Sequence, residues 1–269
     1  MNLTQHQGSI QAAPARLPMW RPAATLSEPD SSNPDMIPYR DTVPCEHTPW
    51  VTWSLIVMNF AVFLACLTLD EKTLTHVYYV FGVVPARYCH PEWAELTGLG
   101  ANDPAPFVTS IFLHGSALHL ITNMWMLWIF GDNVEDRMGA VRYISFYLLC
   151  GIAAAGLQIY ADPHGTAPMI GASGALAGVM GAYFFMYPYA RIVIWVLFMP
   201  LFVQLPAVAF LGAWIIFQLY KATSGVVIGG EYTDVAWWGH LGGIIAGMAS
   251  YRLFQLPGRG FRSGFDAPR

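Results

Sequence analysis

Long stretches of this chain contain no Asp, Glu, Lys or Arg, and six of them are long and mainly apolar. A membrane-spanning helix needs about 20 mainly apolar residues. The pattern therefore predicts six transmembrane helices, at roughly 51–69, 115–133, 142–160, 171–187, 205–221 and 235–254. A further charge-free stretch, 73–86, is too short to span and contains Gly82 and Pro85, so we expect an interfacial segment within a loop.

Composition agrees with this pattern. Of the 269 residues, 55% are hydrophobic and only 11% are charged, with a mean hydropathy of +0.43. A soluble domain carries about 25% charged residues, so an ordinary soluble enzyme is excluded. The net charge is −4 and no basic run is present, so no nucleic-acid partner is expected. The expected fold class is an all-α polytopic membrane protein.

The distribution of Lys and Arg predicts the orientation. The two termini and the loops after the second and fourth helices carry ten of these residues, against three on the other side. The positive-inside bias then places both termini in the cytoplasm, and we expect the plasma membrane, the inner membrane of a bacterium. Three regions follow: a flexible Pro- and Ser-rich cytoplasmic tail (1–49), a membrane domain (50–255) and a cytoplasmic C-terminal tail (256–269). A transit peptide is the alternative for the first, because Arg16 and Arg21 precede the first acid, Glu28.

Polar side chains inside the predicted helices are the candidates for chemistry. Ser173 begins the fourth helix and His240 lies in the sixth, while His119 and Asn123 lie four residues apart on one face of the second. Taken singly, the serine is explained by a hydrogen bond to the preceding helical turn, and each histidine by a hydrogen bond between helices. Together they suggest a serine nucleophile with a histidine base. The Ser173 N–H at the helix start, with His119 and Asn123, could stabilise an oxyanion.

Glycine spacing predicts that the fourth and sixth helices pack closely. Glycines recur every three or four residues on both, at Gly174, Gly178, Gly181, Gly239, Gly243 and Gly247. Such faces let two helix backbones approach, which would bring Ser173 and His240 within hydrogen-bond reach. We expect valine at Gly243 or Gly247 to separate the helices and alanine to be milder. No Asp or Glu lies near these residues in either helix, so a dyad is expected rather than a triad.

Four motifs in this order make the chain resemble the rhomboid family of intramembrane serine proteases over most of 50–255. They are His114-x4-His119-x3-Asn123, Gly131 through Glu135-x-Arg137, Gly171-Ala172-Ser173-Gly174, and Gly239-His240-x2-Gly243-x3-Gly247. The resemblance implies a six-helix rhomboid-like bundle around a water-accessible cavity. It implies Ser173 as nucleophile, His240 as general base, and His119 with Asn123 at the oxyanion hole. It also implies a short fourth helix that starts below the membrane surface, so that water reaches Ser173.

Other residues of the motifs receive structural roles. We expect Gly171, Gly174, Gly243 and Gly247 to shape the site, and His114 to tie the first loop to the second helix. Glu135 and Arg137 are expected to hydrogen-bond loop backbone at the cytoplasmic end. Two features depart from the family pattern. Ala177 stands where an aromatic residue often stacks on the catalytic histidine, a place we expect Trp237 or Trp238 to fill, and Pro106-Phe107-Val108-Thr109 replaces the common Trp-Arg pair.

The sequence therefore predicts an intramembrane serine endopeptidase that acts in the bilayer on single-span membrane proteins and needs no cofactor. A catalytically silent rhomboid-like binding or chaperone module is one alternative, and a small transporter with an intramembrane histidine relay is another. Cys45-x-His47 and Cys89-His90 have no second ligand pair at matching spacing, so no metal is expected. Nor do the four cysteines suggest a disulfide framework. The oligomeric state is left open.

Overall fold

The computed structural model describes residues 41–196, 201–228 and 236–258. Contacts divide the chain into two units, Met1–Ile37 and Pro38–Arg269, and every described residue belongs to the second. Most of the predicted N-terminal tail (1–49), and of the C-terminal tail (256–269), lies outside the described residues.

Long helices occupy each of the six predicted stretches. They are α1 (Trp50–Cys66), α6 (Ala117–Met138), α7 (Ala140–Ala161), α8 (Ser173–Met186), α9 (Ala207–Ile228) and α10 (Trp237–Phe254). The mostly helical fold is thus confirmed. By length and apolarity together, only α7 among the described helices is sufficient to cross a membrane, while α1, α8 and Ala207–Thr223 of α9 are apolar but shorter. The number of spans stays a prediction.

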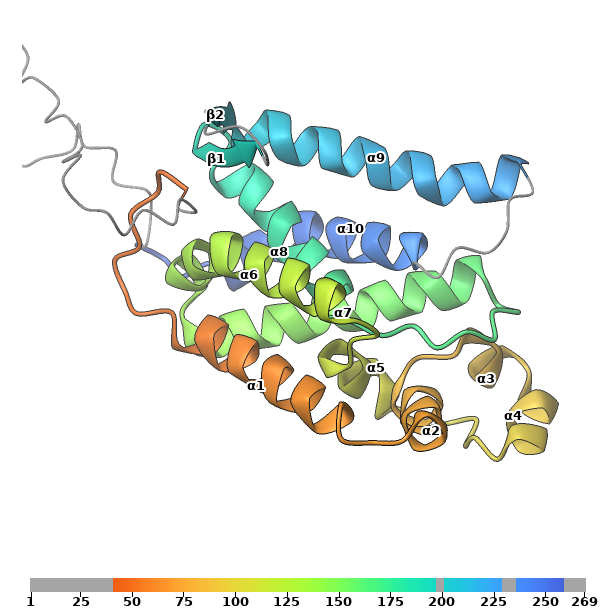
Figure 1. The fold of residues 1–269 in the computed structure, drawn as a ribbon. Coiled ribbons are helices and arrows are strands. Elements are labelled where there is room, and N and C mark those ends of the chain that lie inside the picture. The colour runs from red at the N-terminus through yellow and green to blue at the C-terminus, as the bar shows by residue number, and fades with distance from the viewer. Residues whose placement is uncertain (1–40, 197–200, 229–235, 259–269) are drawn as a thin grey trace, which may run out of the picture. The chain divides into compact units, whose positions relative to one another are not determined.

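Helix α8 lies at the centre and packs against α6, α7, α9 and α10 (Figure 1). Every residue from Gly174 to Tyr183 is buried, and six of these ten are glycine or alanine. Small side chains on all sides of a helix allow neighbours to approach it from every direction. The sequence of α8 therefore suits a helix enclosed by others.

The glycine interface between α8 and α10 is tighter than expected. A β-carbon added at Gly243 would lie 2.0 Å from the carbonyl oxygen of Gly174, and one at Gly247 would lie 2.1 Å from that of Gly178. Both neighbours are backbone atoms, which cannot turn aside as a flexible side chain can. Even alanine at these positions should therefore disrupt the interface, because a single methyl group already overlaps the facing helix. That alanine is milder than valine stays a prediction.

Helix α6 continues beyond 133, the predicted end of the second helix, and stops at Gly139, whose φ is +73°. Its buried Glu135 carboxylate accepts hydrogen bonds from the backbone N–H groups of Val51 (2.9 Å) and Thr52 (2.8 Å) and from the Thr52 hydroxyl (2.8 Å). The carboxylate thus caps the start of α1, where the helix dipole favours negative charge. The guanidinium of Arg137 instead lies over the Tyr187 ring, at 5.6 Å.

The loop between α1 and α6 contains short helices at one end of the bundle (Figure 1). These are α2 (Glu71–Phe81), α3 (Pro85–Cys89), α4 (Pro91–Thr97), α5 (Pro106–Thr109) and a 3₁₀ helix, Ser110–Phe112. The stretch predicted to be interfacial, 73–86, forms most of α2 and the start of α3.

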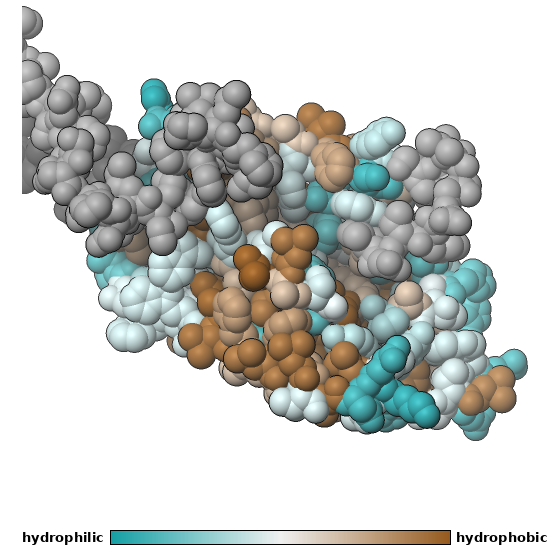
Figure 2. Space-filling view, viewed as in Figure 1, coloured by the Kyte–Doolittle hydropathy of each residue, from teal (hydrophilic) through white to brown (hydrophobic). Residues whose placement is uncertain are grey.

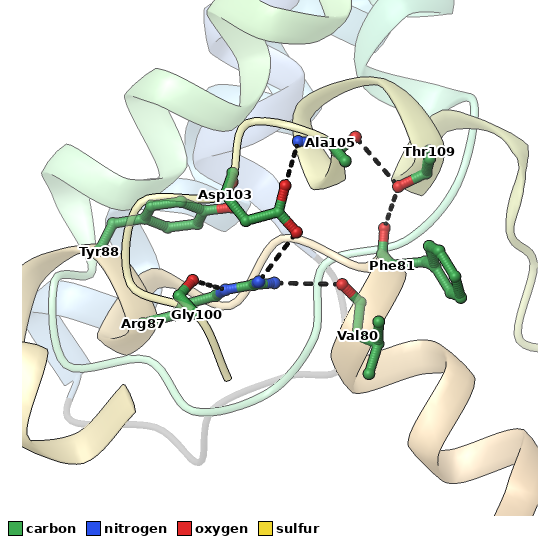
Figure 3. A network of polar contacts seen from close by, with 8 residues as sticks. All are labelled: Val80, Phe81, Arg87, Tyr88, Gly100, Asp103, Ala105 and Thr109. Atoms are coloured by element: carbon green, nitrogen blue, oxygen red, sulfur yellow. Dashed lines mark hydrogen bonds and ion pairs between the residues drawn. The ribbon is translucent and has the colours of Figure 1, made fainter. Parts of the chain in front are cut away.

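A buried arginine holds this loop together (Figure 3). Arg87 donates to the carbonyl oxygens of Val80 (3.1 Å) and Gly100 (2.7 Å) and pairs with the Asp103 carboxylate at 3.1 Å. The Thr109 hydroxyl donates to the Phe81 carbonyl at 2.7 Å. At the place where the resemblance implies a Trp-Arg pair, this chain has α5, and Arg87 joins the parts of the loop.

A β-hairpin precedes α9 and was not predicted. Strands β1 (Arg191–Val196) and β2 (Leu201–Pro206) pair antiparallel, with Ile192 opposite Leu205. Their β-branched and apolar composition is typical of strands. Asp41 forms an isolated antiparallel bridge with Ile192, and its carboxylate accepts hydrogen bonds from Asn133 and from the Tyr183 hydroxyl. The chain just before α1 thus packs against this end of the bundle.

Apolar side chains are exposed along α1 and α6. Figure 2 shows them gathered over the region where Figure 1 draws these two helices. The set includes Val57, Leu64, Leu118, Ile121 and Trp128. Monomeric soluble proteins rarely expose a large continuous apolar surface, whereas such a surface is suited to contact with lipid.

Candidate active site

The turn before α8 sets the position of Ser173. Gly171 has a φ of +123°, which favours glycine because a side chain there would be strained. Its N–H donates to the Ser110 carbonyl at 2.9 Å, and the Ala172 N–H donates to Nε2 of buried His114 at 3.4 Å. Ser173 is then the first residue of the helix. His114, expected to tie the first loop to the second helix, bonds this turn directly.

The loop between α1 and α6 also fixes the segment that leads to this turn. Val83 and Met169 exchange two backbone hydrogen bonds, of 3.0 and 2.8 Å. The Ala86 N–H donates to the Gly165 carbonyl at 2.9 Å. Through these backbone contacts, the loop that Arg87 holds together supports the segment that leads to α8.

Ser173 and His240 are in contact. The Ser173 Oγ lies 2.9 Å from His240 Nε2, although the two residues are 67 positions apart. The contact predicted from glycine spacing is therefore present, and the close approach of α8 and α10 explains it. A serine hydroxyl bonded to an imidazole nitrogen is the geometry in which histidine can accept the serine proton.

His119 and Asn123 face the same turn. A β-carbon on Gly171 would lie 2.9 Å from His119 Nε2 and 3.7 Å from Asn123 Nδ2. Asn123 is only 6% exposed, and its Nδ2 has no hydrogen-bond partner among the described residues. A buried donor without a partner is costly, and this one lies beside the turn that leads to Ser173.

Comparison with known proteins shows the family of this chain. The family model for the rhomboid domain matches residues 101–255, more than half of the chain. The chain belongs to the rhomboid family. The matched region contains all the candidate site residues.

Curated rhomboid relatives come from animals, plants and fungi. The chain is 29% identical over 145 residues to Rhomboid protein 1, mitochondrial, of Saccharomyces cerevisiae, covering 52% of this chain and 39% of the relative. It is 28% identical over 232 residues to Presenilin-associated rhomboid-like protein A, mitochondrial, of Danio rerio, covering 78% and 58%. To the human Presenilin-associated rhomboid-like protein, mitochondrial, it is 31% identical over 147 residues, covering 54% and 36%. The matches thus span between about a third and three fifths of these relatives.

Membership of the family identifies this chain as an integral membrane protein. Rhomboids are in general intramembrane serine proteases, so the family also supports a protease-like function. The roles of the individual residues in this rhomboid remain predictions.

One polar contact of this rhomboid's site was missed by sequence reasoning. The Gln218 Oε1, on α9, lies 2.9 Å from His240 Nδ1, and Gln218 is only 4% exposed. A glutamine in an otherwise apolar stretch is itself a signal, because a polar side chain inside a membrane is expensive. Two tryptophans cover the same imidazole. The Trp237 ring, one of the two expected, lies edge-on to the imidazole with 5.9 Å between the ring centres. The ring of Trp214, a residue of α9, lies with its centre 6.4 Å from that of the imidazole.

Other groups of this rhomboid lie apart from that site. Cys45, Cys66, Cys89 and Cys150 are free thiols. Within the described residues, no cluster of three His, Cys, Asp or Glu side chains could hold a metal ion. Among the residues of the two Cys-His motifs, His47 bonds Asp136 at 2.6 Å, and His90 stacks on His164.

Proposed function

We propose that this chain is an intramembrane serine endopeptidase that cleaves transmembrane segments of single-span membrane proteins with a Ser173–His240 dyad. The observation that carries the proposal is the 2.9 Å contact between Ser173 Oγ and His240 Nε2. It occurs in a chain whose family consists in general of intramembrane serine proteases.

The chemistry follows from the geometry. As Ser173 Oγ attacks the substrate carbonyl carbon, its proton passes to His240 Nε2, and the carbonyl oxygen becomes an oxyanion. The imidazolium then gives this proton to the leaving amine as the peptide bond breaks. A water molecule, deprotonated by the same nitrogen, attacks the acyl-enzyme, and the serine hydroxyl is restored.

Three donors are proposed for the oxyanion. The Ser173 backbone N–H lies in the first turn of α8, where N–H groups have no partner within the helix. His119 and Asn123 supply side-chain donors beside the same turn. Donors aimed at the position where charge develops can each be worth about 10²–10³ in rate.

The length of α8 supports a buried site that water can reach. Its 14 residues rise about 21 Å at 1.5 Å per residue, whereas the hydrocarbon core is about 30 Å thick. If α8 ends at the cytoplasmic surface, Ser173 lies about 10 Å below the opposite one. We propose six spans, with α1, α6, α7, α8, α9 and α10 as the transmembrane helices and both termini in the cytoplasm.

Two native cysteines test this orientation. Cys89 in α3 and Cys45 before α1 are both exposed, and the proposed topology puts them on opposite sides of the membrane. An impermeant thiol reagent added to intact cells should label Cys89, and Cys45 should react only after permeabilisation. Burial, then Asp132 and Asp136, raise the pKa of Cys45 to about 11, so the permeabilised control needs alkaline pH and a longer reaction. Labelling of Cys45 alone in intact cells would reverse the orientation.

The compartment is a separate question with two candidates. The Lys and Arg distribution led us to propose the plasma membrane of a bacterium. The names of several relatives carry the word mitochondrial, and a transit segment at the N-terminus would suit that location. Fractionation of the native source separates the two: a mature chain that lacks its first residues in an organelle fraction would favour the mitochondrial candidate.

A cleavage assay tests the proposed activity. Purified full-length protein is incubated with model single-span substrates, and the new termini are sequenced. We expect one cut within or beside the transmembrane segment, lost in Ser173→Ala. Ser145→Ala is the matched control, because it removes an exposed hydroxyl that only back-bonds to the Val141 carbonyl. Binding of substrates without cleavage would favour the silent module, and solute flux without cleavage would favour a transporter.

A further inference from the structure

We propose that Gln218 positions His240 for proton transfer, by holding the imidazole in the tautomer whose Nε2 accepts the Ser173 proton. This role rests on the proposed protease function. The site would then consist of three residues instead of the expected two: Ser173, His240 and Gln218 of α9, whose carboxamide orients the imidazole.

Both ring nitrogens of His240 are engaged. Nε2 lies 2.9 Å from Ser173 Oγ, and Nδ1 lies 2.9 Å from Gln218 Oε1. The oxygen of a carboxamide can only accept a hydrogen bond, so the proton of the neutral ring must be on Nδ1. Nε2 then carries the lone pair and is ready to take the serine proton. The glutamine thus selects one of two tautomers and fixes the plane of the ring.

A neutral partner suits this location. A carboxylate placed here would have to lose its hydration, and an isolated buried charge is very costly. A carboxamide makes the same hydrogen bond without that charge. In exchange, it stabilises the imidazolium of the transition state less than a carboxylate would. Gln218 should therefore act mainly through orientation, and replacing it with an acid should change the basicity of His240.

Helix α9 presents two groups to this histidine. Gln218 and Trp214 are four residues apart, so they lie on one face of the helix, and both contact the His240 ring. Gln158 on α7 offers a contrast within the same region. Its Oε1 accepts from the Gly239 backbone N–H at 3.1 Å and so supports the start of α10 without contacting the imidazole.

Among the described residues, few other groups lie near enough to influence the basicity of His240. On α8, the Ser173 hydroxyl contacts the His240 ring. On α6, His119 acts on His240 through its charge when the His119 ring is protonated. On α9, Lys221 lies 5.8 Å from the centre of the Trp237 ring, which itself packs edge-on against His240. A change at Gln218 should therefore register in the pH dependence of cleavage.

The test compares three variants of the full-length protein. Gln218→Met keeps the length of the side chain and removes the strong acceptor. We expect kcat to fall about 10- to 10²-fold with little change in KM, because orientation of the base matters only during proton transfer. Gln218→Glu restores an acceptor. We expect it to recover most of kcat and to move the acid limb of kcat/KM to higher pH, because a carboxylate favours the protonated imidazole.

Gln158→Met is the matched control. It removes a hydrogen bond from the helix start and should lower the melting temperature without moving the acid limb. The role of Gln218 would be overturned if Gln218→Met kept the kcat of the wild type. It would also be overturned if the Met and Glu variants merely lost stability, with the acid limb unmoved in Gln218→Glu. The proposed function itself would be refuted if the wild type cleaved no substrate, or cleaved no more than Ser173→Ala measured in parallel. That outcome differs from a failure of the role of Gln218, in which the wild type still cleaves.

Discussion

The two ends of α6 each carry a buried polar side chain, and the two side chains differ in their hydrogen bonds. Near its start, Asn123 is buried and its Nδ2 has no hydrogen-bond partner among the described residues. Near its end, Glu135 is equally buried, and its carboxylate accepts three hydrogen bonds from the first residues of α1. Both side chains belong to the motifs that make this chain resemble a rhomboid.

The difference separates structure from proposed chemistry. A fully bonded buried carboxylate stabilises the folded chain, and its removal leaves backbone donors without a partner. A buried donor without a partner costs stability until a group arrives to accept its hydrogen bond. We expect that group to be the oxyanion of the transition state. Changes at the Asn123 end should then affect rate, and changes at the Glu135 end should affect stability.

The largest effect on rate should come from the nucleophile. Ser173→Ala removes only the attacking oxygen, so we expect cleavage to fall to background, at least about 10³-fold, with an unchanged melting temperature. Cleavage and thermal unfolding are measured on the same preparation. Residual cleavage above a few per cent would reject Ser173 as the nucleophile.

The next largest effect should come from the donor near the start of α6. Asn123→Ala should lower kcat by roughly 10- to 10³-fold, while KM and stability change little. The backbone donor of Ser173 remains, so some activity should survive. A raised KM at constant kcat would instead make Asn123 a substrate-binding residue.

The glycine interface should show the largest effect on stability. Gly243→Ala places a methyl group 2.0 Å from the Gly174 carbonyl oxygen, so α8 and α10 must move apart. We expect a loss of about 3 kcal/mol in the free energy of unfolding, and reduced cleavage because Ser173 and His240 separate. Gly156→Ala is the control, since a β-carbon there meets nothing within 4 Å apart from the backbone of its own helix and its chain neighbours. Equal stability of the two variants would contradict the close packing of the helices.

The smallest effect should come from the bonded end of α6. Glu135→Gln keeps the shape of the side chain but removes its charge and replaces one acceptor oxygen with an NH2 group, which cannot accept the hydrogen bond of the α1 N–H group that faces it. We expect a loss of about 1–2 kcal/mol in the free energy of unfolding and unchanged kcat for the folded fraction. Glu71→Gln, at an exposed position, provides the baseline. A fall in kcat without a fall in stability would remove the contrast with Asn123.

Sequence reasoning predicted what depends on local pattern. Gaps between charges located the six long helices, and the glycine spacing predicted the contact of Ser173 with His240. It missed what depends on rotation of one helix against another. Gln218 meets His240 only because α9 turns that face toward α10, and no spacing within α9 reveals this. The partners of Glu135 are likewise more than 80 positions away.

The hairpin and the first loop were missed for a related reason. No charged residue separates the apolar residues of β1 and β2 from the following helix, so hydropathy alone did not distinguish the strands from that helix. Arg87 was counted only as a loop charge, whereas it is buried and holds three parts of the loop. Its partners lie in the last turn of α2 and in the segment between α4 and α5, and the sequence pattern does not reveal that these parts meet.

The central claim is that Ser173 is a nucleophile activated by His240, and labelling with a fluorophosphonate tests it most directly. Purified protein is treated with the reagent, digested and analysed by mass spectrometry. We predict a single adduct on Ser173, strongly reduced in His240→Ala and retained in Glu135→Gln. A wild type that stays unlabelled, or an adduct on another serine that persists in Ser173→Ala, would contradict the account.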